Sequence, residues 1–490
     1  MIKLALIDDG VVDSYLVTKC YAHYKVNNDI LDKVICASSN EINHATKCAM
    51  IIEKYATNVA FIDIDIFEKE KNQLTNIDKL ISGIELAYEC GAKLVYFSLG
   101  SIYFQDREKL RRCVNRFAAL GVIFVSPDSN TNNITYPATF STVLSVKSHE
   151  TSQIDSDYFQ IIDNDIFFGT DFIANSIHSI WKGNTTERCN SFAAPVIVAH
   201  VYNILRKNST LSITGIRTAL RSQSKVATDK NTGCPTKKLD WLYCSILISD
   251  MLQVPEDEYI YFRLCSFLQT QFITESTIKK IYSLLDGEDC DSIIVCFSRD
   301  LSDIELAFIQ SLKKNIAIIS PNKKLCRVHT DYLFYRLPIA EEWSVPNIYG
   351  DIKCDEPVVK IAVESNQALL IAATIYRYLF SHEYNALVLS DIPSVLFMGG
   401  EFIPSQILRG DIDAIRRYLY CINNLGYYDI DIIVFDSMIE GTCLMLESDV
   451  SLEITVQKGI AQIRNGVVDV QIPLESIGEY ITNLFDKSEG

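Results

Sequence analysis

Short apolar segments alternate with longer amphipathic ones along the first two hundred residues, and this alternation limits the fold more than any other feature of the sequence. The apolar segments have the length of β-strands and lie at 2–8, 58–67, 92–100 and 121–127. Between them, the segments 76–91 and 106–121 repeat apolar residues with helical spacing. This order predicts an α/β fold built on a doubly wound parallel sheet.

Polar residues gather where the predicted strands end. Asp8 and Asp9 end the first strand. Ser98 and Gly100 end the third, and the polar run SPDSNTNN follows the fourth. Parallel sheets place ligands and catalytic groups beyond the carboxyl ends of their strands. The sequence therefore predicts a functional site at this edge of the sheet.

The chain is too long for one ordinary core, because single cores stop growing well below 490 residues. A linker near 249–262 separates a second half with further apolar strands. These lie at 259–265, 292–298, 315–321, 358–365, 385–391 and 429–437. We predict a first domain over 1–250 and a second α/β domain over 258–490, with a sub-boundary near 345–357.

The formal charge of −17 argues against nucleic acid or an anionic membrane surface as the main partner, since both bind through clustered Lys and Arg. A basic peptide is the better match. No apolar run reaches the length of a membrane span, and the opening MIKLALIDDG carries two acids where a signal peptide needs apolar residues. We expect a cytoplasmic protein without a membrane partner.

The 15 cysteines are scattered, with no CxxC pair or zinc-type histidine spacing. This pattern indicates reduced and mostly buried thiols. It predicts neither disulfides nor zinc, and we expect no metal and no cofactor.

Three segments supply the residue types of a serine nucleophile with its base. His44 opens a helical pattern over 40–56, and Ser191 precedes the apolar run that ends at 205. With Asp8 they form an acid, a base and a nucleophile, in which His takes the serine proton and Asp fixes its tautomer. Asn130 offers a side-chain donor for the oxyanion. Taken singly, Ser191 and Asp8 read as helix caps, His44 as a helix-start or surface histidine and Asn130 as a turn residue.

The order of these segments resembles the subtilisin-like serine proteases over roughly residues 1–250. The similar motifs are LALIDDG (4–10), HATKCAMII (44–52), YFSLGS (96–101), FVSPDSN (124–130) with TYPATFSTVLSVKS (135–148), and NSFAAP (190–195). The resemblance implies Asp8, His44 and Ser191 as the triad and Asn130 as the oxyanion donor. It also implies that Ser98, Leu99 and Gly100 bind the substrate backbone.

Several glycines of the family's motifs are replaced here. Ala45 stands after the histidine, Ser129 before the asparagine, and Cys189 with Asn190 before the serine, while Lys47 replaces a second histidine. Such glycines allow unusual dihedral angles or close backbone approach. The sequence therefore leaves two hypotheses open, an active protease and a catalytically impaired protein of the same fold. Cys189 as a thiol nucleophile is a third, disfavoured because no separate base is implied for it.

The second half contains a strand, loop and helix layout over 358–378 that resembles a phosphate-binding loop without its glycines and lysine. It also resembles, loosely, a P-loop-like accessory protein of bacterial ribosomal-peptide maturation systems. We expect a degenerate nucleotide-binding-like domain that binds no nucleotide.

Together these features predict a cytoplasmic serine endopeptidase that cleaves a specific peptide, the leader of a ribosomally made, modified peptide. Its partners would be that peptide and other peptide-maturation enzymes. The alternative is a peptide-binding or scaffold protein of the same pathway. Because the chain opens on the strand that carries Asp8, we expect no inhibitory propeptide.

Overall fold

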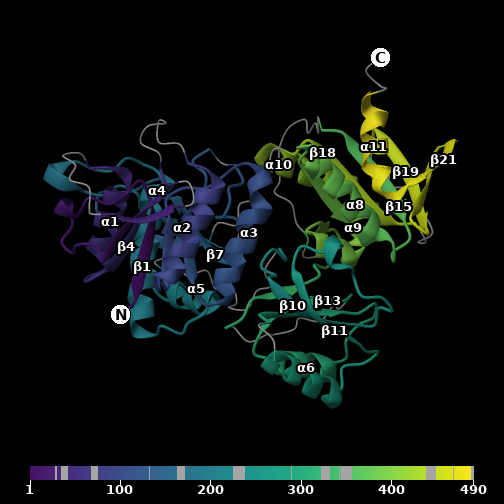
Figure 1. Ribbon diagram of the computed structural model, residues 1–490, viewed down its shortest axis with the longest axis horizontal. Helices are drawn as coiled ribbons and strands as arrows, with labels where there is room; N and C mark the ends of the chain where they lie inside the picture. The colour runs from purple at the N-terminus through teal and green to yellow at the C-terminus, as the bar shows by residue number, and fades with distance from the viewer. Residues whose placement is uncertain are drawn as a thin grey trace. The chain divides into compact units, whose positions relative to one another are not determined.

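The computed structural model describes residues 1–490 except for 28–29, 35–41, 68–74, 132, 163–170, 225–237, 288–289, 322–330, 341–342, 344–355, 427, 438–447, 467 and 487–490. The chain divides into two compact units (Figure 1). The first unit is Met1–Tyr243 with Val328–Leu333, and the second is Cys244–Arg327 with Phe334–Gly490. The domain limits expected from the sequence stay a prediction, and the sub-boundary near 345–357 falls almost wholly outside the described residues.

The first unit is built on a nine-stranded sheet with the order β3-β2-β4-β1-β5-β6-β7-β9-β8. Its strands are β1 (Lys3–Asp8), β2 (Ala22–Asn27), β3 (Ile30–Val34), β4 (Ala60–Asp65), β5 (Leu94–Phe97), β6 (Ile123–Pro127), β7 (Val143–Ser148), β8 (Phe159–Ile161) and β9 (Phe172–Ala174). In this order, each strand from β2 through β4, β1, β5, β6 and β7 to β9 pairs in parallel with the next. Among the described residues, the pairs β2–β3 and β8–β9 at the two edges of the sheet are antiparallel. The α/β fold class and the four strands expected from the sequence are confirmed.

Helices cover both faces of this sheet because successive strand residues point to opposite faces. Leu4 and Leu6 of β1 share a core with α1 (His44–Tyr55), α4 (Asn190–Lys207) and α5 (Ile213–Arg221). Ile7 points the other way, against Gly83 of α2 (Ile77–Glu89). Helix α2 runs beside α3 (Phe104–Ala119), where Tyr88 contacts Phe117 (Figure 1). The result is a doubly wound layer structure with β1 near its centre.

The second unit holds two further sheets. One has the order β11-β10-β12-β13-β14, with β10 (Cys244–Ser249), β11 (Arg263–Gln269), β12 (Ser292–Cys296), β13 (Asn315–Ile319) and β14 (Phe334–Arg336), all parallel. The other has the order β17-β16-β18-β15-β19-β20-β21, with β15 (Val358–Val363), β16 (Ala386–Ser390), β17 (Glu401–Phe402), β18 (Ile430–Asp436), β19 (Val450–Gln457), β20 (Ile460–Asn465) and β21 (Val468–Pro473). The helices are α6 (Glu275–Gly287), α7 (Asp303–Ser311), α8 (Ala368–Ser381), α9 (Ser405–Gly410), α10 (Ile412–Gly426) and α11 (Ile477–Asp486).

One expectation about the cysteines is wrong. Cys244 of β10 and Cys265 of β11 form a disulfide, with their Cα atoms 6.2 Å apart. These strands are parallel neighbours, so the chain brings together two residues that are 21 positions apart. That spacing matches no cysteine motif, so the sequence pattern alone could not reveal the pair.

The strand, loop and helix layout expected in the second half is present as β15, the loop 364–367 and α8. Ser365 in this loop donates a hydrogen bond to the carboxylate of Asp436, at the end of β18. A loop bonded to a carboxylate is a poor cradle for phosphate. The resemblance to a P-loop-like accessory protein stays a prediction.

In the part of the chain that the structure describes, we find no helix with the length and apolar character needed to cross a membrane. The cytoplasmic location stays a prediction.

Candidate active site

The position of His44 is fixed by the start of helix α1. Asn43 caps this helix, and its side chain accepts a hydrogen bond from the Thr46 amide at 3.2 Å. The carboxylate of Asp9 also lies against the first turn. It accepts hydrogen bonds from the backbone amides of Ala45, at 2.8 Å, and His44, at 3.3 Å. The residue next to Asp8 therefore holds the helix that carries the imidazole.

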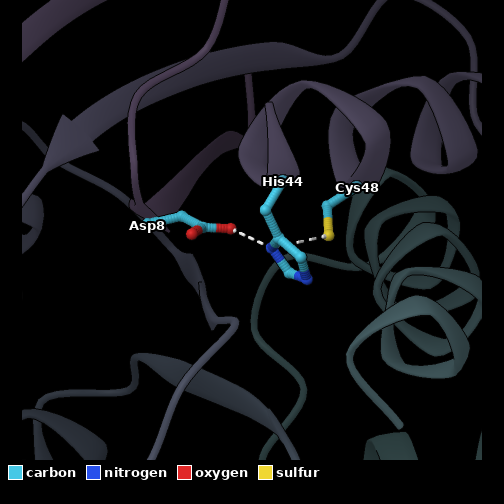
Figure 2. Close-up of side chains that lie close together, drawn as sticks. All are labelled: Asp8, His44 and Cys48. Carbon is cyan, nitrogen blue, oxygen red and sulfur yellow. Dashed lines mark hydrogen bonds and ion pairs between the residues drawn. The ribbon is translucent and has the colours of Figure 1, made fainter. Parts of the chain in front are cut away.

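Asp8 ends β1 and is only 2% exposed. Its Oδ2 lies 2.7 Å from Nδ1 of His44, and Figure 2 shows the imidazole between this carboxylate and the sulfur of Cys48. An ionised carboxylate can only accept, so Nδ1 carries a proton and donates it to Asp8. In a neutral imidazole this leaves Nε2 as the acceptor.

Ser191 lies in the first turn of α4, and its Oγ is 2.9 Å from Nε2 of His44. Four residues later, Pro195 lacks the amide that would bond to the Ser191 carbonyl in a regular helix. The phenol of the buried Tyr96 on β5 takes that place and donates to the carbonyl at 2.8 Å. The sheet and the proline together therefore hold the serine in position.

The ring of Phe192 covers one face of the His44 imidazole. The two rings stack with centroids 4.9 Å apart, and the His44 side chain is 32% exposed. The ammonium group of Lys47 lies over the same Phe192 ring, with its Nζ 5.7 Å from the ring centroid. The imidazole is therefore only partly covered, and its Nε2 faces Ser191.

Opposing effects act on the pKa of His44. Burial favours the neutral imidazole, but the sulfur of Cys48 and the carboxylate of Asp8 act against it, and the net direction is upward. Burial also raises the pKa of the Cys48 thiol, which is therefore uncharged near neutral pH. We accordingly attribute the raised pKa of His44 to the carboxylate of Asp8.

Asn130 reaches the start of α4. Its Oδ1 accepts a hydrogen bond from the Asn190 amide at 2.9 Å, which fixes which end of the side chain is oxygen. The Nδ2 group then points to the sulfur of Cys189, at 3.4 Å. That sulfur lies 2.9 Å from Oγ of Ser191. Asn130 and Ser191 thus flank the same small space, and the Cys189 sulfur lies in it.

The segment 98–100 lies at the same edge of the sheet, directly after β5, where Phe97 pairs with Ile7. It passes close to a neighbouring loop. A Cβ added to Gly100 would lie 2.8 Å from the carbonyl oxygen of Tyr136, so only glycine fits there. The structure therefore brings Asp8, His44, Ser191 and Asn130 together and places Ser98, Leu99 and Gly100 at the same sheet edge.

The replaced glycines do not strain the backbone. Among the described residues, the non-glycine positions with positive φ are Asn58, Asp155, Lys182, Glu383 and Lys458. Ala45, Ser129, Cys189 and Asn190 are not among them. Asn190 also serves as a brace, because its side chain accepts from the Ser148 amide and donates to the carbonyl of Ser129. Of the residues that replace these glycines, Cys189 has the clearest effect on the site, because its side chain fills space between Asn130 and Ser191.

Sequence reasoning missed three supports of this site. They are the Asp9 carboxylate at the helix start, the Tyr96 phenol on the serine carbonyl, and the Cys48 sulfur beside the imidazole. Asp9 and Pro195 are signals that could have indicated the first two. Asp8, His44 and Cys48 are also close enough to hold a metal ion, but the same imidazole connects the carboxylate of Asp8 with the hydroxyl of Ser191.

No family model and no curated protein matches the chain. Among solved structures it is similar to a lanthipeptide protease, with 15% identity over 45% of this chain and 79% of the other, and a TM-score of 0.34. It is also similar to a cold-adapted subtilisin-like serine proteinase (18% identity, 47% and 83% covered, TM-score 0.36) and to the epidermin leader peptide processing serine protease from Staphylococcus aureus (14%, 47% and 71%, TM-score 0.36). A likeness at these TM-scores and identities shows neither a shared family nor a shared reaction.

Proposed function

We propose that the first unit is a subtilisin-like serine endopeptidase in which Asp8, His44 and Ser191 form the catalytic triad. The supporting observation is the position of His44, 2.7 Å from the Asp8 carboxylate on one side and 2.9 Å from the Ser191 hydroxyl on the other. A carboxylate, an imidazole and a hydroxyl in this order form a nucleophile, its base and the group that orients the base.

In the proposed reaction, Oγ of Ser191 attacks the carbonyl carbon of the scissile peptide bond while Nε2 of His44 accepts its proton. The imidazolium formed in this step is stabilised by Asp8, which stays ionised. His44 then gives the proton to the leaving amine, and the acyl group remains on Ser191. Water, deprotonated by the same imidazole, releases the acyl group and restores the serine.

The negative charge that develops on the carbonyl oxygen needs donors close to Ser191. The Nδ2 group of Asn130 is one candidate, since its orientation is fixed by the bond to Asn190. The backbone amide of Ser191 is another, because the first amides of a helix have no partner within the helix. The helix dipole of α4 favours negative charge at the same place.

The substrate in this proposal is a peptide, and the specific hypothesis is the leader of a ribosomally made, modified peptide. One of the similar solved structures is a leader peptide processing protease, and we take leader cleavage as the hypothesis to be tested. Because the net charge of the chain is negative, we expect it to bind basic segments of such a peptide more tightly than acidic ones.

The test is to incubate the purified full chain with synthetic precursor peptides of basic and acidic leader sequence, and to map products by mass spectrometry. Cleavage at one position, absent in Ser191→Ala and present in Ser212→Ala, is expected. Ser212 is a matched control because it also lies at a helix start, as the cap of α5. Cleavage that persists in Ser191→Ala would contradict the proposed nucleophile.

The second candidate function is a catalytically impaired peptide-binding protein, and one observation favours it. The sulfur of Cys189 lies 2.9 Å from Oγ of Ser191 and 3.4 Å from Nδ2 of Asn130, in the space an oxyanion would need. If this sulfur does not move aside, a peptide could bind at the site without being cut. Binding of a precursor peptide without cleavage, unchanged in Ser191→Ala, would favour this function.

A further inference from the structure

A second group of chemically active side chains lies in the first unit, outside the triad. One ligand atom each of Asp13, Cys20 and His23 lies within 4.8 Å of the others. Asp13 begins a short 3-10 helix (Asp13–Tyr15) after β1, and His23 belongs to β2. The triad uses none of them, and the proposed peptidase reaction gives them no role.

The histidine of this group is oriented by a fourth residue. Nδ1 of His23 lies 2.8 Å from Oδ2 of Asp63 on β4, whose side chain is 5% exposed. The carboxylate fixes the proton on Nδ1, so the lone pair of Nε2 points away from Asp63 and toward Asp13. This is the arrangement by which proteins orient a metal-binding histidine.

The other nitrogen of the imidazole faces a second carboxylate. Nε2 of His23 is 3.2 Å from Oδ2 of Asp13, a contact that needs either a second proton on the imidazole or a cation between the two atoms. A nitrogen and an oxygen bound to one tetrahedral zinc ion lie about 3.3 Å apart, given bond lengths of about 2.0 Å. The sulfur of Cys20 adds a third ligand of the type that zinc prefers.

We propose that Asp13, Cys20 and His23 bind a zinc ion, with Asp63 holding the histidine and water completing the coordination. Oδ1 of Asp13 accepts from the Cys20 amide at 2.9 Å, so Oδ2 is the oxygen that faces Nε2 of His23 and would bind the metal. The side chain of Asp13 is 17% exposed, so the site opens to solvent and an ion can enter.

The expected role of this ion is structural. Oδ1 of Asp63 accepts from the Val11 amide at 2.9 Å, and Val11 follows Asp8, Asp9 and Gly10 directly. The metal would therefore hold the segment that leaves β1 against β2 and β4. The spacing of residues in the sequence does not reveal this group, because Asp13 and Asp63 lie outside the short interval from Cys20 to His23.

The experiment measures Zn²⁺ binding to the full chain by isothermal titration, and Co²⁺ binding by the sulfur-to-cobalt charge-transfer absorption. The variants are Cys20→Ser and Asp63→Asn, and Cys90→Ser is the matched control because Cys90 is also a half-buried cysteine of the first unit outside any disulfide. We expect Cys20→Ser to abolish the cobalt band and weaken Zn²⁺ at least tenfold. Asp63→Asn should weaken Zn²⁺ by about 10- to 100-fold, and Cys90→Ser should match the wild type.

Zn²⁺ binding to the wild type can also be measured without any variant. Zn²⁺ should protect Cys20 from alkylation, measured for each cysteine peptide by mass spectrometry. The proposal is overturned if Zn²⁺ leaves the alkylation of Cys20 unchanged, or if Cys20→Ser binds Zn²⁺ and Co²⁺ as the wild type does. A cobalt band that is lost in Cys48→Ser instead would assign the metal to the Asp8, His44 and Cys48 group and would equally overturn it.

Discussion

The carboxylate of Asp9 accepts a hydrogen bond from the backbone amide of His44, at 3.3 Å, and so ties the end of β1 to the start of α1. Asp8 binds the imidazole of the same histidine from the preceding position in the chain. Two adjacent acids thus have different tasks, since one orients the ring and the other positions the helix that carries it. The distance from Asp8 to Nδ1 therefore depends on Asp9.

Asp9→Asn should reduce kcat, because an amide offers one acceptor oxygen where the carboxylate offers two to the amides of His44 and Ala45. A shift of the helix start by about 1 Å can cost roughly 100-fold in rate. Asp78→Asn is the control, an acid in the first turn of α2 whose side chain is largely exposed. Steady-state kinetics on a cleaved peptide provide the measurement, and an unchanged kcat in Asp9→Asn would contradict this role.

Asn130→Ala should lower kcat by roughly 100- to 1000-fold with little change in KM, because an oxyanion donor strengthens its bond only in the transition state. Thr131→Ala is the control in the same loop, where the hydroxyl contacts only the neighbouring Ser129 at 2.9 Å among the bonds we describe. Of the other asparagines in this loop, Asn132 lies outside the described residues. A large loss in Asn133→Ala with a silent Asn130→Ala would show that the motif was aligned wrongly.

Cys189→Ala should increase the rate of serine modification, because it removes the sulfur that lies between Asn130 and Ser191. A small thiol-blocking reagent should slow the wild type and leave Cys189→Ala unaffected. The readout is the rate of covalent labelling of Ser191 by a fluorophosphonate. Equal rates in both proteins would mean that the sulfur does not hinder the site.

Asp431→Asn should stabilise the second unit at alkaline pH. Burial raises the pKa of Asp431 from 3.8 to about 7, and the charge of Glu356 adds to this. The folded state therefore holds a proton that the unfolded state has lost, so stability falls as the pH rises from about 4 to 7. The difference of about three pH units corresponds to up to about 4 kcal/mol at this site.

Asparagine at position 431 carries no charge and can donate to Oδ1 of Asn423, which has no hydrogen-bond partner among the described residues. Chemical denaturation at pH 5 and pH 8 provides the measurement. The variant should gain stability relative to the wild type at pH 8 and little at pH 5. A variant that is less stable at pH 8 would contradict the raised pKa.

The parallel core of the first unit was predictable because its strands are buried on both faces and read as continuous apolar runs. Strand β1 is the clear case, since Leu4 to Ile7 are all fully buried. The antiparallel strands β19 to β21 were missed. In β19 the buried residues alternate with exposed ones, as Val450 and Leu452 do around an exposed Ser451. This two-residue period indicates a half-buried strand, so the sequence carried a signal that a search for continuous apolar runs passes over.

The site was predictable as far as the reactive side chains follow strand ends and helix starts. Asp8, His44 and Ser191 meet because β1, α1 and α4 all begin or end at one edge of the sheet. The supports come from long-range packing. Tyr96 looks like an ordinary core aromatic in the sequence, and only the fold places its hydroxyl on the carbonyl of Ser191.

The reactivity of Ser191 is tested most directly by labelling the native chain with a fluorophosphonate and locating the adduct by mass spectrometry. The proposed triad predicts one adduct, on Ser191, in the wild type. The adduct should be lost in His44→Ala and in Ser191→Ala. The rate of peptide cleavage by a double variant should be no lower than that of either single variant, because the triad acts as a unit. A folded wild type that acquires no adduct on Ser191, or one that acquires it equally well in His44→Ala, would contradict the triad.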